Sequence, residues 1–161
     1  MIRQAVASDA AAIAAFWNPQ IRDSLVTFNS VEKTPNEIAG DMAAKQGQGH
    51  GFWVAEADGK VLGFASYGQF RGGIGYARSM EHTIILGPEA RGQGLGRALM
   101  EVLLDHARGA GVHMMMAGIC AENAGGLRFH EAMGFVSVGR VPEVGYKFGR
   151  YLDLVLMQYR L

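Results

Sequence analysis

The sequence predicts an α/β fold of the α+β kind, with a mixed central sheet of about seven strands and about four helices on its two faces. Strand-like and helix-like segments follow one another in the order β-α-α-β-β-β-α-β-α-β-β. An Asp58-Gly59 pair joins two strand-like segments into a hairpin. A glycine-rich run, Arg91-Gly92-Gln93-Gly94-Leu95-Gly96, opens straight into a helical pattern. Together these observations predict one mixed sheet with an anion-binding turn after one of its strands.

The first third of the chain predicts one strand and two helices. Residues 2–6 form the first strand, and a helix follows through the alanines to about Trp17. The segment 18–33 has scattered apolar residues without a clear period, so we expect a loop or a short helical piece. Thr34-Pro35-Asn36-Glu37 is a helix start, with Thr as N-cap, Pro at the first position and Glu closing a capping box. That helix is expected to end near Gln46.

The remaining elements follow from alternation, apolar runs and turn residues. Residues 52–57 and 60–67 flank the Asp58-Gly59 turn as a hairpin. The helix after the glycine run places Leu95, Leu99, Leu103 and Ala107 on one apolar face. Four further strands and one further helix are predicted: strands over 79–86, 112–120, 135–138 and 150–157, and a helix over 123–133.

Composition indicates one globular domain over residues 1–161. Apolar residues make up 49% and charged residues 19% of the chain, and 15 basic side chains balance 15 acidic ones. A net charge of zero gives no electrostatic footprint of a protein that binds nucleic acid or an anionic membrane. Cys120 is the single cysteine, which excludes an internal disulfide. With no signal-like or membrane-spanning run, we expect a cytoplasmic protein with no nucleic-acid, membrane or metal partner.

The glycine run predicts a site for a phosphate group. Its glycines let backbone N–H groups point into one concavity, and the helix that follows adds about half a positive charge. Arg97 and Ala98 after Gly96 do not match the Gly-Lys-Ser/Thr ending of a P-loop. The G-x-G-x-G spacing, beyond mid-chain, does not match a dinucleotide fingerprint. A plain glycine-rich connection between a strand and a helix is the alternative.

Two motifs together carry a resemblance to a known family. Arg91-x-x-Gly94-x-Gly96 resembles the pyrophosphate loop of the GNAT acyltransferase superfamily. Asn123, followed by Phe129-His130-Glu131-Ala132-Met133-Gly134-Phe135, is similar to that superfamily's Asn, amphipathic helix and closing Gly-Phe. The resemblance implies the GNAT fold, with a mostly antiparallel sheet, and acetyl-CoA as acyl donor. The residues it implies for coenzyme binding are Thr83, Ile84, Ile85, Arg91, Gly92, Gln93, Gly94, Leu95, Gly96 and Asn123.

Acyl transfer to an amine needs a proton acceptor and a donor to the developing oxyanion. Glu81 is the expected base, on the strand that leads to the glycine run; a solvated glutamate is the alternative. His82 is the reserve base, although strand alternation points it to the opposite face. His130 stands where the superfamily often has a Tyr that protonates the departing thiolate, and a packed or surface histidine is the competing interpretation. Backbone groups of residues 83–85 are expected to face the coenzyme arm and the reacting carbonyl oxygen.

A closer resemblance covers nearly the whole chain. Residues 134–139 and 143–153 look like the tail of phosphinothricin and methionine sulfoximine N-acetyltransferases, and Thr27-Phe28, Tyr76 and Glu81 also match that group. Tyr151 stands where Trp is common, and 71–75 is richer in glycine than expected. The resemblance implies an α-amino acid acceptor whose carboxylate a bidentate Arg would bind. The residues expected at the acceptor are Phe28, Arg71, Gly72, Gly73, Tyr76, Arg78 and Glu81.

Two other classes of function stay open from the sequence. One is an N-acetyltransferase for another amine, a protein N-terminus or a polyamine. The other is a catalytically silent module that binds acyl-CoA. The resemblance also implies a homodimer. Cys120 is interpreted as a small buried hydrophobe, and the spacing of His50, His106 and His113 does not suit a shared metal.

Overall fold

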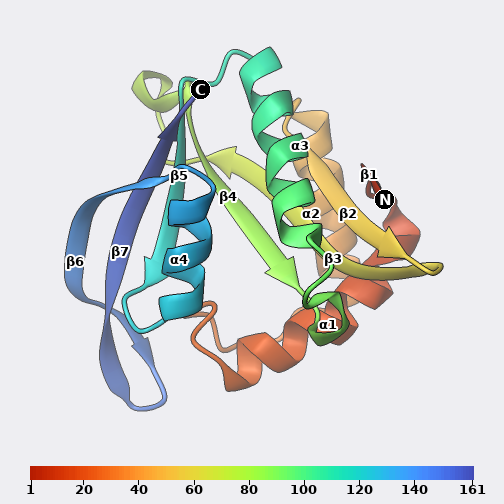
Figure 1. The fold of residues 1–161 in the computed structure, drawn as a ribbon, viewed down its shortest axis with the longest axis horizontal. Helices are drawn as coiled ribbons and strands as arrows, with labels where there is room; N and C mark the ends of the chain where they lie inside the picture. The colour runs from red at the N-terminus through yellow and green to blue at the C-terminus, as the bar shows by residue number, and fades with distance from the viewer.

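A computed structural model describes all of residues 1–161 (Figure 1). One seven-stranded sheet runs through the molecule in the order β1-β2-β3-β4-β5-β7-β6. Every neighbouring pair is antiparallel except β4 and β5. The predicted fold class and order of elements are confirmed. The strands are β1 (Ile2–Gln4), β2 (Phe52–Ala57), β3 (Lys60–Gln69), β4 (Ser79–Leu86), β5 (Met114–Cys120), β6 (Val136–Lys147) and β7 (Arg150–Arg160).

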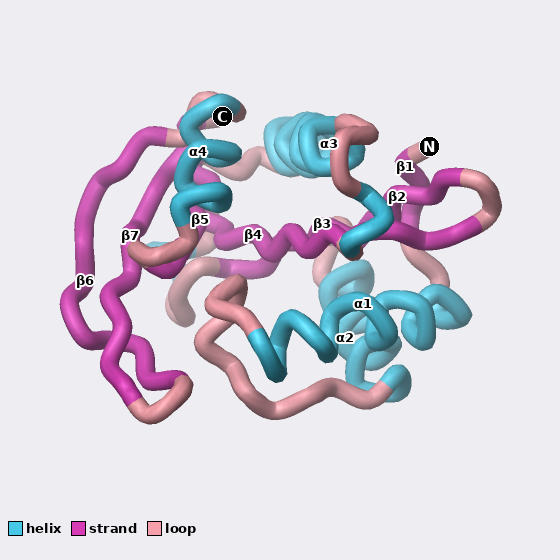
Figure 2. The backbone as a smooth tube through the Cα atoms, turned by 60° about the horizontal axis from the view of Figure 1, so that its bottom comes forward, coloured by secondary structure: helices cyan, strands magenta, loops and turns pink.

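Helices cover both faces of the sheet (Figure 2). On one face lie α1 (Ala10–Asp23) and α2 (Pro35–Gly47), and on the other lie α3 (Leu95–Gly109) and α4 (Ala124–Ala132). Each face has its own core: Leu99 and Leu103 of α3 are buried in the larger one, and Ile13 of α1 in the smaller. None of these helices is both long and apolar enough to cross a membrane.

Local sequence signals account for several boundaries. The Thr34 side chain accepts a hydrogen bond from the Glu37 N–H at 3.1 Å, and the Glu37 carboxylate accepts one from the Thr34 N–H at 3.2 Å. This is the predicted capping box of α2, with Pro35 at its first position. Asp58 and Gly59 both have positive φ, 51° and 73°, as a two-residue hairpin turn requires.

The expectation of a loop or short piece over 18–33 is wrong for its first part, because α1 continues to Asp23. Pro19 lies inside the helix without ending it. Ile13, Trp17 and Ile21 are four residues apart, and Ile21 is completely buried. Burial of this face therefore extends the helix past the proline.

The last hairpin is longer than predicted. The expected strand over 135–138 is the beginning of β6, which continues to Lys147 and pairs with β7. Two shifts of register interrupt the pairing, one between Ser137 and Gly139 and one between Val141 and Gly145. Pro142 is tolerated because β6 is an edge strand. The irregular pairing removes the simple alternation from which a long strand is predicted.

The sheet opens between β4 and β5. The two strands pair only from Ser79 with Met114 to Glu81 with Met116. Beyond that point β4 remains paired with β3, and β5 remains paired with β7. The strands therefore diverge after Glu81, and the gap between them is the position of the site.

Candidate functional site

A cleft of about 1690 Å³ occupies the opening between β4 and β5. Residues 81–86 of β4 and the following Gly87 line one side, and Gly118, Ile119 and Cys120 of β5 line the other. The segment after α1 and the start of α4 complete the walls, and Arg91 lies at the end where the glycine loop begins. A long cleft of this kind has room for an extended ligand that enters between two strands.

The glycine loop has the backbone that its sequence predicts. Gly92 and Gly94 have φ of 73° and 71°, in the left-handed region that favours glycine. Gly94 is the N-cap of α3 and supplies no side chain, so the first N–H groups of the helix keep no intrahelical partner. A Cβ on Gly96 would lie 3.0 Å from the Leu86 side chain, so this glycine allows α3 to approach β4. These residues fit a pyrophosphate at the start of α3.

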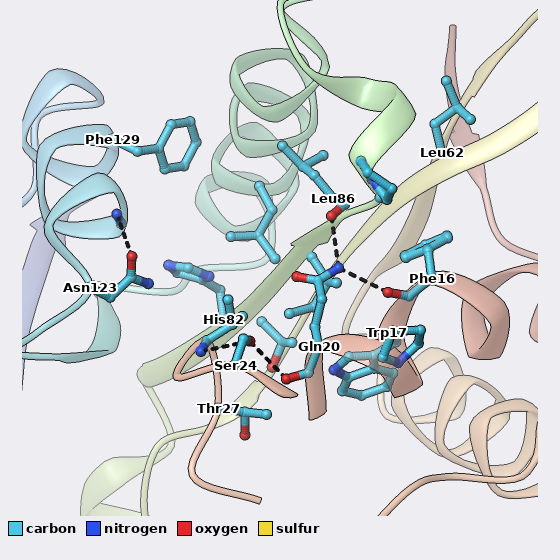
Figure 3. Close-up of a pocket in the computed structure, with 18 of the residues that line it drawn as sticks. Phe16, Trp17, Gln20, Ser24, Thr27, Leu62, His82, Leu86, Asn123 and Phe129 are labelled. Atoms are coloured by element: carbon cyan, nitrogen blue, oxygen red, sulfur yellow. Dashed lines mark hydrogen bonds between the residues drawn. The ribbon is translucent and has the colours of Figure 1, made fainter. Parts of the chain in front are cut away.

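Asn123 caps a helix and also faces the cleft. Its side-chain oxygen accepts a hydrogen bond from the Gly126 N–H at 3.0 Å, so it caps α4 (Figure 3). Asn123 also lines the cleft. Capping uses only the oxygen, and the amide N–H groups remain available to a bound ligand.

The free edge of β4 offers backbone groups to the cleft from alternate residues only. The Gly87 N–H donates to the Leu62 carbonyl at 2.7 Å, and the Phe70 N–H donates to the Ser79 carbonyl at 3.0 Å. In an antiparallel ladder with this register, the backbone groups of Thr83 and Ile85 also point to β3. Of the three residues predicted to offer backbone groups, only Ile84 directs them into the opening.

Gln20 of α1 occupies one of the backbone groups on that free edge. Its side-chain amide donates to the carbonyl of Leu86 at 2.9 Å and to the carbonyl of Phe16 at 2.9 Å (Figure 3). The carbonyl of Leu86 is therefore occupied, whereas the backbone groups of Ile84 stay free in the middle of the cleft. Gln20 could not be identified from the sequence, because the segment 18–33 was expected to be a loop or a short helical piece rather than part of a helix facing β4.

Glu81 lies where β4 and β5 begin to diverge. Its side chain is open to the cleft, yet the surrounding protein removes enough water to raise the pKa of its carboxyl group above the usual value. A Cβ on Gly118 would lie 3.3 Å from Glu81 Oε2, so the glycine makes room for the carboxylate. The carboxylate forms no salt bridge. A glycine inside an apolar strand was the signal that could have identified Gly118.

His82 and His130 form a buried pair on the other face of β4. The His130 Nδ1–H donates to the Gly126 carbonyl at 2.7 Å, since a carbonyl only accepts. Burial lowers the pKa of His130, and it lowers the pKa of His82 to about 3, so both rings are neutral near pH 7. The His130 Nε2 atom is then an acceptor, and the His82 Nε2–H donates to it at 3.0 Å.

This tautomer assignment has two consequences. His130 has no free proton, because its Nδ1–H already donates to Gly126. The His82 Nδ1 atom carries a lone pair, is buried and has no hydrogen-bond partner. Both histidines line the cleft, although strand alternation directs His82 away from the face that carries Glu81. The pair therefore offers the cleft a proton acceptor rather than a proton donor.

Phe28, one of the residues predicted to bind the acceptor substrate, lines the same cleft as Glu81. It belongs to the segment 24–29, which lines the cleft after α1 ends. Leu154 of β7 lines the same region and was missed from the sequence, where it belongs to an ordinary apolar run. Leu154 lies beside Gly118, since a Cβ on that glycine would lie 3.4 Å from the Leu154 side chain.

The other predicted acceptor residues lie away from the cleft. Arg71, Gly72, Gly73 and Tyr76 belong to an exposed loop before β4, in which the Arg71 guanidinium lies 5.4 Å from the centre of the Tyr76 ring. Arg78 lines a separate cavity of about 560 Å³. The reason is strand geometry: each residue of β4 adds about 3.3 Å, so nearness to Glu81 in sequence does not bring these side chains to it.

Comparison with known proteins agrees with this architecture. Residues 18–135 match the acetyltransferase (GNAT) family. The L-methionine sulfoximine/L-methionine sulfone acetyltransferase of Salmonella typhimurium is 39% identical over 161 residues, covering 99% of this chain and 94% of the relative.

Two solved structures share the fold over the whole chain. The ribosomal-protein-alanine N-acetyltransferase of Brucella melitensis has a TM-score of 0.96 at 37% identity, covering 100% of this chain and 99% of that one. The phosphinothricin acetyltransferase of Sinorhizobium meliloti, solved in complex with acetyl-CoA, has a TM-score of 0.95 at 31% identity, with 100% and 88% covered. With its divergent β4 and β5 and its glycine loop at the start of α3, this chain belongs to the GNAT acetyltransferase family.

Proposed function

We propose that this protein transfers the acetyl group of acetyl-CoA to the α-amino group of a small amino acid or analogue of the methionine sulfoximine, methionine sulfone or phosphinothricin type. The observation that carries the proposal is the position of Glu81. Its carboxylate lies at the point where β4 and β5 diverge, in a cleft whose other end is the glycine loop. The similarity to the methionine sulfoximine and phosphinothricin enzymes supports the class of acceptor.

The coenzyme fits the residues present at one end of the cleft. Arg91 and the N–H groups at the start of α3 would hold the pyrophosphate, and the Asn123 amide and the Ile84 backbone would hold the arm. When bound, acetyl-CoA supplies the thioester whose acetyl group goes to the amine nitrogen. The free N–H of Ile84 is the donor within the opening for the carbonyl oxygen.

Glu81 acts on the amine. An ammonium group cannot attack a carbonyl, so its proton has to leave first, either directly or through a water. The raised pKa of Glu81 makes its carboxylate a better acceptor for that proton than an exposed glutamate. His82, the reserve base, is the weaker acceptor, because burial lowers the pKa of its ring to about 3. His130 could protonate the thiolate only after its Nε2 atom had gained a proton, which His82 Nε2 is placed to supply.

The test is an assay of acetyl transfer by thiol release. Methionine sulfoximine, methionine sulfone and phosphinothricin are offered with acetyl-CoA, beside a polyamine and a peptide with an N-terminal alanine. Turnover with any of the three small acceptors, at a kcat/KM above those of the peptide and the polyamine, supports the proposal. Preference for the peptide or the polyamine would mean that the acceptor is a protein N-terminus or a polyamine and not a small amino acid. Binding of acetyl-CoA with no turnover at all would favour the silent module.

A homodimer and a cytoplasmic location remain predictions. The homodimer is supported by a group of exposed large apolar side chains on the last hairpin, namely Val136, Val138, Val144, Tyr146, Phe148 and Tyr151. Monomeric proteins rarely expose so many large apolar side chains in one place. Light scattering after size-exclusion chromatography measures the mass directly, and a mass near 17.3 kDa would contradict the dimer.

A further inference from the structure

Lys147, near the end of β6, is a buried lysine with an unusual set of partners. Only 3% of its surface is exposed. Its ammonium group donates to the carbonyl of Ser24 at 2.6 Å and to the carbonyl of Thr27 at 2.7 Å. It forms no salt bridge with a carboxylate, and desolvation lowers its pKa. Lys147 therefore joins the last hairpin to a segment more than a hundred residues earlier in the chain.

A second contact holds the same segment. Gly145, two residues before Lys147, is buried against the ring of Phe28: a Cβ on Gly145 would lie 2.5 Å from two of its carbon atoms. The absence of a side chain at 145 thus leaves the space that Phe28 fills. Figure 2 shows the segment that follows α1 passing beside the turn between β6 and β7.

The segment has few hydrogen bonds with which to hold itself. The Ser24 hydroxyl donates to the Gln20 carbonyl, and the Val26 and Asn29 N–H groups donate to the hydroxyl oxygens of Ser24 and Thr27. These are local turns, and none of them reaches the sheet. The two carbonyls that Lys147 holds would otherwise lack a partner in a partly buried position. The position of the segment therefore depends on the hairpin.

The segment is also a wall of the cleft. Residues 24–29 line it together with Glu81 and Gly118, whereas no residue of β6 does. We propose that Lys147 is a positioning residue: through Ser24 and Thr27 it fixes the wall that faces the acceptor, and Gly145 seats Phe28 in that wall. The role of Lys147 rests on the proposed function, because the wall that it holds would contact the amino acid acceptor.

Replacement of Lys147 by methionine tests the proposal, because methionine keeps the length and removes the donors. We expect kcat/KM for the acceptor to fall about tenfold to a hundredfold through KM, with the dissociation constant of acetyl-CoA unchanged. Arg140→Met is the control, since Arg140 is an exposed cation of the same strand that pairs with Asp153 instead. An equal loss in both variants, or no loss in Lys147→Met, would overturn the proposal.

Trypsin gives a readout that needs no turnover. Arg22 and Lys33 flank the segment, and we expect cleavage at these two sites to be faster in Lys147→Met than in the wild type and in Arg140→Met. This part stands even if the wild-type protein acetylates none of the acceptors, so the two proposals can fail separately. Unchanged cleavage in a folded Lys147→Met protein would show that the lysine does not hold the segment.

A second variant covers the case in which Lys147→Met does not fold. Gly145→Ala introduces a methyl group where Phe28 lies, so it should raise the acceptor KM in the same way. In a Phe28→Ala background the clash is absent, and Gly145→Ala should then have little further effect. If the effects of Gly145→Ala and Phe28→Ala on the acceptor KM were additive, the contact between residues 145 and 28 would not be the cause of the raised KM.

Discussion

The Nε2 atoms of His82 and His130 lie 3.0 Å apart in the buried wall of the cleft. Because His130 donates its other ring proton to Gly126, the hydrogen bond between the two rings runs from His82 to His130. The face of β4 that this pair occupies is the one opposite Glu81. The strand β4 thus presents the Glu81 carboxylate on one side and the His82 ring, paired with His130 of α4, on the other. Each can be tested separately.

The histidine pair predicts a loss of stability in acid. His82 has a pKa lowered from 6.5 to about 3, so below pH 6.5 the unfolded chain binds a proton that the folded chain does not. The free energy of unfolding should therefore fall as the pH falls from about 6.5 towards 3. Urea unfolding of the wild type and of His82→Phe at a series of pH values measures it.

Comparison of the two proteins isolates this contribution. His130 of α4 stacks on the His82 ring and is the titratable group that affects its pKa, and the Phe135 ring lies edge-on to both. Paired carboxylates such as Asp9, whose pKa is lowered, weaken both proteins equally in acid. An identical pH dependence in His82→Phe would contradict the prediction.

Replacement of Glu81 by glutamine should lower kcat/KM by about a hundredfold to ten-thousandfold, the usual contribution of a general base. The affinity for acetyl-CoA should not change, because its proposed binding site is the glycine loop at the other end of the cleft. Isothermal titration and steady-state kinetics separate the two quantities. Glu131→Gln, on the exposed side of α4, is the matched control.

The pH profile provides a second readout for Glu81. Burial raises its pKa above 4.5, and only the deprotonated carboxylate accepts a proton. In the wild type, kcat/KM should therefore rise with pH through an acid limb above 4.5, and that limb should be absent in Glu81→Gln. If the acid limb were unchanged in Glu81→Gln, a group other than Glu81 would be responsible for it.

Alanine at Gly94 should weaken coenzyme binding. Gly94 has φ of 71°, where a residue with a Cβ costs about 1–2 kcal/mol. Relief of that strain would move the N–H groups at the start of α3, so the dissociation constant of acetyl-CoA should rise about tenfold. Gly109→Ala is the control: it ends the same helix, its φ is not positive, and a Cβ there meets nothing within 4 Å. Equal affinities of the two variants would contradict the role of the loop.

Alanine at Ile21 tests why α1 continues past Pro19. Ile21 is completely buried, so its truncation should lower the free energy of unfolding by about 2–5 kcal/mol. Gln20 lies on the same turn and bonds to Leu86, so a frayed end of α1 should also weaken acceptor or coenzyme binding. Ala15→Gly, at an exposed position before the proline, should cost only about 1 kcal/mol. A small loss in Ile21→Ala would mean that this face does not hold the helix.

Local signals in the sequence determined much of the fold and one end of the site. Thr34 with Glu37, Asp58 with Gly59, and the glycine run each specify a backbone conformation within a few residues, so their structure could be predicted. Glu81 could be placed on its strand by the same reasoning. The extension of α1 and the length of β6 could not, because burial of Ile21 and pairing with β7 decide them.

Only the tertiary structure decided how the acceptor end is built. The hydrogen bonds from β4 to β3 leave Ile84, rather than Thr83 or Ile85, facing the opening. Arg71 and Arg78 lie near Glu81 in sequence but away from the cleft, whereas Lys147 lies far from Ser24 in sequence and is bonded to it. Sequence patterns report neighbours along one chain segment. Contacts between distant segments depend on how the strands diverge and pack, and no local pattern encodes that.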